Sequence, residues 1–199
     1  VYRINTNLGY LLIGTLSSNA GEVYMDENLN NQICIVDGVN AYIYNHSLAP
    51  NLTIQTLSGT LIPNYVAYHN TFFLFGNGNT SGNGAAWYAY SFSTDTTIVQ
   101  ATQLALQTKP DYAIAVKRIP SQSANVLVFG TAVCEVHQQV GGILNYQRVN
   151  SVSVDYGCLN VSTIDAADQF IAWLGVNEFN SPVIMVYSGQ GATSISTDG

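Results

Sequence analysis

Glu135 and His137 are the side chains in this sequence that come nearest to a metal site. They alternate within an apolar run, so in a β-strand both would lie on one face. A zinc-type site needs further ligands, yet His46 and His69 lie far away in the sequence without metal-ligand spacing. A solvated or structurally hydrogen-bonded His137 is therefore favoured, and no metal-binding residue is predicted.

Two acidic residues, Asp165 and Asp168, are spaced closely enough to suggest the paired carboxylates of glycoside hydrolysis. They lie in a polar stretch between two apolar runs, which is typical of a turn between strands. Gly-x-Ser-x-Gly and Walker motifs are absent from the sequence. No catalytic residue is predicted, and the chain is not expected to be an enzyme.

The glycine-rich segment 76–82 imitates a dinucleotide-binding fingerprint, but its glycines have the wrong spacing. It leads into Trp87-Tyr88, which is typical of a strand and not of a helix. Segment 76–84 is instead predicted to be a polar surface loop that opens easily. No cofactor-binding residue is predicted.

A carbohydrate-binding or carbohydrate-cleaving protein is the alternative function that these side chains leave open. Exposed rings of Trp87, Tyr88 and Tyr90 could stack on sugars. Because these residues alternate faces within one strand, most of them are expected in the core. Cleavage would need carboxylates that converge on one channel, whereas the acidic candidates hold different positions in the sequence repeat: Asp37, Glu135, Asp165 and Glu178.

The charged residues argue against a protein that binds DNA tightly. Lys and Arg number 5 against 12 Asp and Glu, which gives a net charge of −7. Lys109, Lys117 and Arg118 form the only local basic grouping, and Arg148 stands alone. DNA-binding proteins neutralise several phosphates with clustered cations. Tight direct binding to duplex DNA is therefore not expected.

The 3 cysteines are widely spaced and lie inside apolar runs. This pattern predicts buried, reduced thiols, with one disulfide plus a free thiol as the alternative. The residues are Cys34, Cys134 and Cys158.

A sequence pattern recurs four times along the chain: an apolar run, a glycine, a short turn and a second run rich in Tyr, Val and Ile. The glycines are Gly38, Gly76, Gly130 and Gly175, which are 38, 54 and 45 residues apart. Each copy is typical of a β-hairpin with the glycine at an inter-strand turn. A strand-only repeat of about 45 residues favours a β-propeller over a sandwich of short strands.

Each copy extends to a four-stranded antiparallel sheet, or blade. The strands expected before and after the four hairpins are 22–26 and 52–57, 65–69 and 97–100, 112–117 and 146–149, and 158–164 and 192–196. The expected fold is all-β: a β-propeller, or a propeller fragment, of about four blades. A fragment would expose sheet edges, and strand 10–13 is expected to pair with the last blade and cover one of them.

Length and composition agree with this fold. The chain has 199 residues, of which 47% are hydrophobic and 9% are charged, and no apolar run approaches the roughly 20 residues that span a membrane. It begins Val1-Tyr2-Arg3, without an initiator Met or a signal peptide. Residues 1–199 are expected to form one β-propeller-like domain, as a fragment of a longer chain.

Several motifs follow one another from about Glu22 to the end of the chain. The first combines 32–38 with 42–44; next come a Pro-Asp before a strand in 109–116 and a Phe-Gly turn in 127–136. Later ones are 156–159, 170–175, 186–189 and 194–197. This collinear series resembles the packaged-DNA stabilisation proteins of short-tailed bacteriophages, which are tail accessory or tail hub proteins.

The resemblance implies a non-enzymatic virion structural protein without a membrane anchor. Such a protein would act as a tail hub or plug below the portal and adaptor ring, help to retain packaged DNA and carry distal tail proteins. It would be a ring-type homo-oligomer in the phage tail and would assemble in the bacterial cytoplasm. Family members are longer than this chain, and segment 76–84 has no counterpart in them. The matched motifs look structural, so no binding residue can be carried over.

Overall fold

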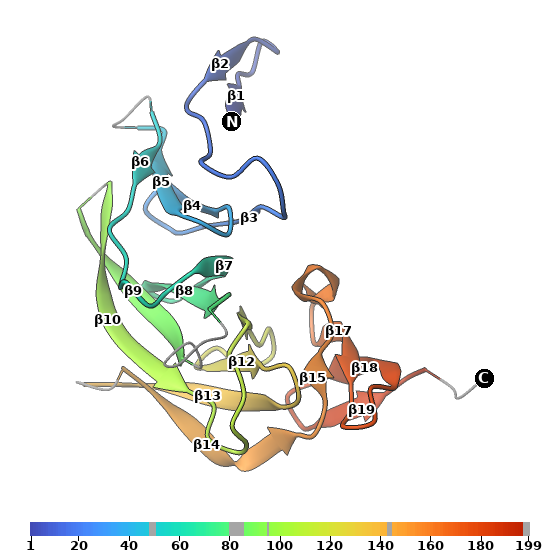
Figure 1. The fold of residues 1–199 in the computed structure, drawn as a ribbon. Coiled ribbons are helices and arrows are strands. Elements are labelled where there is room, and N and C mark those ends of the chain that lie inside the picture. Colours follow the sequence, from blue (N-terminus) through green and yellow to red (C-terminus); the bar gives the residue numbers. More distant parts are fainter. Residues whose placement is uncertain (48–50, 80–85, 95, 143–144, 197–199) are drawn as a thin grey trace.

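A computed structural model describes residues 1–47, 51–79, 86–94, 96–142 and 145–196 (Figure 1). The regular elements in this part of the chain are strands, apart from one 3-10 turn, η2 (Val161–Thr163). Four antiparallel sheets follow one another along the chain, as predicted.

Blades 1 and 2 have four strands each, in sequential order. Blade 1 consists of β3 (Tyr24–Glu27), β4 (Gln32–Val36), β5 (Ala41–Asn45) and β6 (Thr53–Ile54). Blade 2 consists of β7 (Pro63–His69), β8 (Phe72–Asn77), β9 (Ala86–Thr94) and β10 (Thr97–Ala105).

Blade 3 repeats this order, whereas blade 4 divides its first strand into two pieces. Blade 3 consists of β11 (Ala115–Arg118), β12 (Asn125–Phe129), β13 (Cys134–Gly141) and β14 (Asn145–Val154). Blade 4 consists of β15 (Gly157–Cys158), β16 (Asp165–Ala166), β17 (Ile171–Val176), β18 (Pro182–Tyr187) and β19 (Ala192–Ser194).

The single strand predicted over 158–164 is therefore wrong. Between β15 and β16 the chain leaves the sheet as η2, because the Asn160 side chain accepts hydrogen bonds from the backbone N–H and the hydroxyl of Ser162. An asparagine that satisfies nearby N–H groups in this way competes with strand pairing. Both β15 and β16 still pair with β17, so the first position of the blade is filled twice.

The four blades are arranged in an arc, with the β1–β2 hairpin beyond blade 1 and blade 4 at the other end (Figure 1). The predicted pairing of strand 10–13 with the last blade is wrong. β2 (Tyr10–Leu12) pairs with β1 (Tyr2–Ile4) in a hairpin of its own. Its loop is closed locally by hydrogen bonds from Leu8 N to Asn5 O and from Asn5 N to Gly9 O.

Neighbouring blades pack face to face through apolar clusters. One cluster joins blades 1 and 2, a second joins blades 2 and 3, and a third is mainly between blades 3 and 4. In the third, the rings of Phe129 and Trp173 meet edge to face with centroids 5.4 Å apart. Fully burying a large apolar side chain contributes about 1.5–3 kcal/mol, so blades 2 and 3, which are covered on both sides, are well anchored.

Gly38, Gly76 and Gly130 lie at contacts between blades, whereas Gly175 lies inside blade 4, where an added Cβ would first meet Met185 of the same blade. Gly38 does lie in a turn and has φ +77°, but Gly76 and Gly175 lie inside strands β8 and β17, and Gly130 follows β12 directly. The predicted set of four equivalent inter-strand turns is therefore wrong. A Cβ at Gly76 would lie 2.1 Å from the Ile114 carbonyl oxygen of the next blade.

Three backbone hydrogen bonds connect the end of the second strand of one blade to the first-strand region of the next. They run from Gly38 N to Pro63 O at 3.2 Å, from Asn77 N to Ala113 O at 2.9 Å, and from Cys158 N to Gly130 O at 2.8 Å. We call these contacts the blade junctions. At one of them, Gly76, the next blade leaves no room for a side chain, whereas a Cβ at Gly38 would meet nothing within 4 Å.

Candidate functional site

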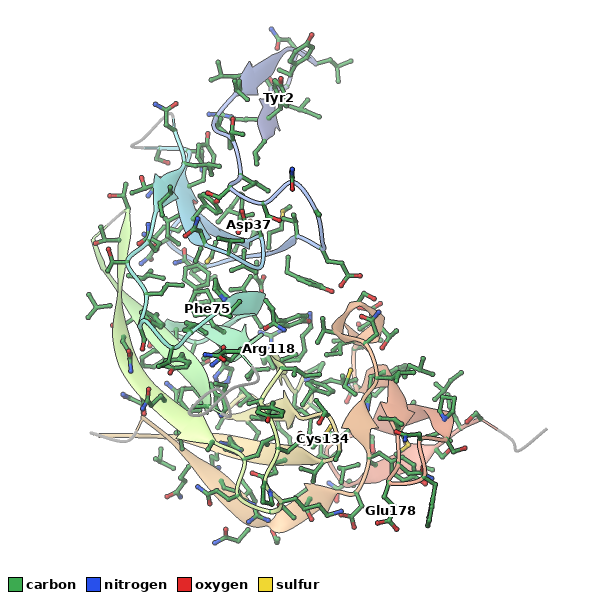
Figure 2. All side chains as sticks on the ribbon, viewed as in Figure 1. Tyr2, Asp37, Phe75, Arg118, Cys134 and Glu178 are labelled. Atoms are coloured by element: carbon green, nitrogen blue, oxygen red, sulfur yellow. The ribbon has the colours of Figure 1, made fainter. Side chains whose placement is uncertain are left out.

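A cavity of about 330 Å³ lies where the first strands of blades 1, 2 and 3 come together. In Figure 2 the labelled Arg118 lies toward the inner side of the arc. The cavity is therefore the candidate axial site of the propeller. Its lining residues are Asp26, Glu27, Ala67, Tyr68, Lys117, Arg118, Pro120 and Ala166.

The axial cavity carries both signs of charge. One Asp26 carboxylate oxygen accepts from Tyr68 N at 2.7 Å, which ties blade 1 to blade 2. Lys117 and Arg118 make no ion pair within 4.0 Å in the described part of the chain. Asp26 and Glu27 are neighbours in a strand and point to opposite faces, so they do not form a facing pair of carboxylates. The cavity can bind a polar group, but it lacks the geometry of glycoside cleavage.

Glu135 and His137 lie on one face of β13, completely buried between blades 2 and 3. The His137 Nε2 atom is 3.1 Å from Glu135 Oε2, and the other carboxylate oxygen accepts from the backbone N–H groups of Gln107 and Thr108. Burial alone would raise the pKa of Glu135, but these hydrogen bonds outweigh it and lower the pKa to about 2. Arg148 adds a cation, with Nε 3.7 Å from the carboxylate. The pair is a structural tie that solvent does not reach.

Among the described residues, no group of three or more His, Cys, Asp or Glu side chains is arranged to hold a metal ion. His69 is buried between blades 2 and 3, with Nδ1 2.7 Å from the Tyr146 hydroxyl and Nε2 2.8 Å from Ser123 O. His46 lies in the turn after β5, beside Ser47.

The four acidic candidates for sugar chemistry do not converge. Asp37 closes the turn after β4, where its carboxylate accepts from Val39 N, Asn40 N and three other donors. Glu135 is buried in blade 3, and Glu178 lies at the surface near Lys109.

The expectation that Asp165 and Asp168 share a turn holds for only one of them. Asp165 begins β16 and pairs with Ala172, whereas Asp168 is exposed in the following turn. Asp165 therefore belongs to the sheet of blade 4.

Trp87, Tyr88 and Tyr90 are buried, so they are not sugar platforms. The expectation that most of them belong to the core is confirmed. The hydroxyl of Tyr90 accepts from Ser58 N at 2.8 Å, and the hydroxyl of Tyr88 is 2.6 Å from that of Thr60. These phenols tie the loop before blade 2 to the face of its third strand.

The motifs around 109–116 and 127–136 meet in space. The buried carboxylate of Asp111 accepts from the backbone N–H groups of Thr131, Ala132 and Val133, and from the Thr131 hydroxyl. The Pro-Asp motif therefore holds the Phe-Gly turn of the same blade in place. The order of these motifs is visible in the sequence, whereas their contact is visible only in the structure.

The predicted loop 76–84 is in part a strand. Gly76 and Asn77 are buried in β8, where the Asn77 amide donates to Thr60 O and Ala86 O. Gly78 and Asn79 follow the strand as a partly buried loop, and residues 80–84 lie outside the described residues.

The basic residues are dispersed. Lys109 pairs with Asp155 at 3.0 Å on the surface, Arg148 faces Glu135, and Lys117 and Arg118 share the axial cavity with two acids. No basic stripe is formed by these residues.

All three cysteines are buried and free of disulfides, as predicted: Cys34, Cys134 and Cys158. Burial raises the pKa of each thiol, in the case of Cys158 to about 11. Neutral thiols of this kind are poor nucleophiles.

The sequence and the architecture are similar to those of known proteins. A family model described as "Bacteriophage P22 Gp10, beta-propeller" matches residues 1–199. A protein from Lactobacillus plantarum has a similar crystal structure, with a TM-score of 0.59, 12% identity, and coverage of 99% of this chain and 63% of that one. The chain thus spans less than two thirds of that protein's length. Hsv2p from Kluyveromyces lactis is more distant, with a TM-score of 0.42, 11% identity and coverage of 85% and 47%. No curated protein matches the sequence.

Proposed function

Because the chain belongs to the bacteriophage P22 Gp10 β-propeller family of phage DNA-stabilisation proteins, we propose that it acts as a tail hub or plug of the virion. It attaches below the portal and adaptor ring, helps to retain the packaged genome and carries distal tail proteins. It has no enzymatic role. The family match over the whole chain is the observation that carries this proposal.

The distribution of charge supports retention by steric blocking. With a net charge of −7 and no basic stripe, the surface repels duplex DNA over a screening length of about 8 Å at physiological salt. Protein contacts with the portal and adaptor then hold the plug in place. Weakly adhesive walls also let DNA pass at infection.

The roles of the buried polar side chains support a structural function. Within the described residues, Asp37, Asn77, Asp111 and Glu135 bind backbone groups and do not converge into a catalytic set. The described residues contain no helix that is long and apolar enough to cross a membrane. We further propose that residues 1–199 form one β-propeller-like unit and that the protein works as a ring-type homo-oligomer in the tail.

Purified chain mixed with DNA-filled heads that carry portal and adaptor tests the proposal. We expect the chain to sediment with these heads and to reduce the nuclease-sensitive DNA that they release. Heads without the adaptor ring are the control and should not bind it. Equal binding to both kinds of head, or unchanged DNA release, would contradict the proposed role.

A mobility-shift titration tests the steric account separately. We expect no shift of duplex DNA by the isolated chain near 0.1 M salt. Micromolar affinity that weakens steeply with salt would refute blocking without adhesion and would point to Lys117 and Arg118 as phosphate contacts.

A further inference from the structure

Several buried polar atoms between blades 2 and 3 have no hydrogen-bond partner within the described part of the chain. They are Trp87 Nε1, Thr108 Oγ1, His137 Nδ1 and Arg148 Nε. The side chains of Trp87 and His137 are both completely buried. Buried polar atoms in folded proteins are nearly always hydrogen-bonded, to protein or to ordered water, so a group of four requires a physical explanation.

The Glu135 carboxylate lies at the centre of this group. Thr108 N donates to one of its oxygens, so the Thr108 hydroxyl lies beside the carboxylate. Arg148 Nε is 3.7 Å from the other oxygen, which is longer than a hydrogen bond, and Arg148 lies directly opposite His137 across β13 and β14. The Trp87 and His137 rings meet edge to face with centroids 5.7 Å apart. The unpartnered atoms therefore come from both blades and from the segment that connects them.

The hydrogen-bonding capacity of these atoms specifies what can bind among them. The indole N–H of Trp87 and the Nε–H of Arg148 can only donate. Glu135 is ionised, since its pKa is about 2, so His137 Nε2 carries the proton that faces the carboxylate. In the neutral ring His137 Nδ1 is then an acceptor. The site requires a group that accepts two hydrogen bonds and donates at least one.

Water is a small molecule with this combination, because it has two lone pairs and two hydrogens. A metal ion or an ammonium ion could not accept from the N–H groups of Trp87 and Arg148. A halide ion could not donate to His137, and the carboxylate of Glu135 would repel it. A polar site with three or four partners is the usual environment of a buried water molecule.

We propose that one internal water molecule is bound between blades 2 and 3, where it accepts from Trp87 Nε1 and Arg148 Nε and donates to His137 Nδ1. The water extends the Glu135–His137 pair into a network that joins β9 of blade 2 to β13 and β14 of blade 3. Because packed blades surround it, the water exchanges with bulk solvent only when this interface opens. The site does not depend on the proposed role in the virion.

Nuclear Overhauser effects between water and the indole N–H groups of the nitrogen-15-labelled chain test this proposal. The chain has 2 tryptophans, and Trp173 is the matched control because it is equally buried and its Nε1 donates to Gly157 O at 3.1 Å. We expect a cross peak between water and the Trp87 N–H, with the sign of a long-lived contact, and none for Trp173. The Trp173→Phe variant assigns the two indole signals.

Hydroxyl protons that exchange with water could produce a similar cross peak. Thr108→Val and Tyr146→Phe each remove one nearby hydroxyl group, since the Tyr146 and Trp87 rings have centroids 5.2 Å apart. The cross peak should persist in both variants, because three partners are enough to hold a buried water. Its loss in either variant would overturn the proposal.

A crystal structure at a resolution that shows ordered waters gives the position of the molecule. We expect one density peak within about 3.2 Å of Trp87 Nε1, His137 Nδ1 and Arg148 Nε. The absence of this peak would refute the proposal. So would a Trp87 N–H that points into the Tyr146 ring, because that contact would satisfy the indole without water.

Discussion

Replacing Gly76 by alanine tests whether a glycine is required at the junction between blades 2 and 3. The added methyl carbon would lie 2.1 Å from Ile114 O and 2.7 Å from Ala115 Cα. Observed Cβ contacts essentially never fall below 3.0 Å, so the entry to β11 must shift by about 1 Å. Because the obstructing atoms are backbone, no side-chain rotation can relieve the contact.

The cost can be estimated from two terms. Overpacking of a rigid core typically costs about 1–3 kcal/mol. The same shift weakens the junction hydrogen bond from Asn77 N to Ala113 O, which is worth about 1 kcal/mol. We expect Gly76→Ala to lower the free energy of unfolding by about 2–4 kcal/mol. For a chain of this size that corresponds to a fall in Tm of about 4–16 °C.

Urea unfolding followed by tryptophan fluorescence measures this loss, because Trp87 and Trp173 lie in blades 2 and 4. Gly59→Ala is the matched control: an added Cβ there meets nothing within 4 Å. It should leave stability unchanged or raise it by up to about 1 kcal/mol. If Gly76→Ala and Gly59→Ala agree within about 0.5 kcal/mol, the junction account is wrong.

Three further outcomes follow from buried polar groups. Asp111→Ala leaves the N–H donors of the turn 131–133 without an acceptor and should lower the free energy of unfolding in urea by about 2–4 kcal/mol. Asp168→Ala, at an exposed site, should change it by no more than about 0.5 kcal/mol. Equal effects would contradict the role of Asp111 in holding this turn. Burial is the main cause that lowers the pKa of His69 below 6.5, so the unfolded chain binds the proton more readily than the folded chain. The free energy of unfolding should therefore be highest above pH 6.5 and fall as the pH drops below it. His69→Asn should flatten that part of the pH profile, and an unchanged profile would refute this role of His69. A disulfide-exchange reagent at pH 8 should react slowly with the native protein, because Cys34, Cys134 and Cys158 are buried. After denaturation it should react quickly with three thiols, and fewer than three would indicate a disulfide.

Strand periodicity was sufficient to predict most of the blades. Apolar runs such as 72–75 and 126–129 occur within strands β8 and β12, because β-branched and aromatic residues fit a buried sheet. The first strand of blade 4 could not be predicted, since a local side-chain bond at Asn160 outweighed the apolar pattern. The pairing of β2 was also missed, because propensity does not specify which strand a strand meets.

Only the basic residues of the axial cavity could be recognised in the sequence. Lys117 and Arg118 stood out as a basic pair, but Asp26 and Glu27 come from a strand about 90 residues earlier and gave no local signal. The role of Asp111 was hidden for the same reason, since its donors lie about 20 residues away in the sequence. Contacts between distant segments follow from the stacking of blades, which no local pattern encodes.

The blade junctions also bear on the order in which the chain can acquire its structure. Every blade is built from consecutive strands, and each junction joins a blade to the one before it. Each blade therefore packs on the blade that precedes it in the chain. As the polypeptide leaves the ribosome, blade 1 can form first and offer its apolar face to blade 2, with blades 3 and 4 adding in turn.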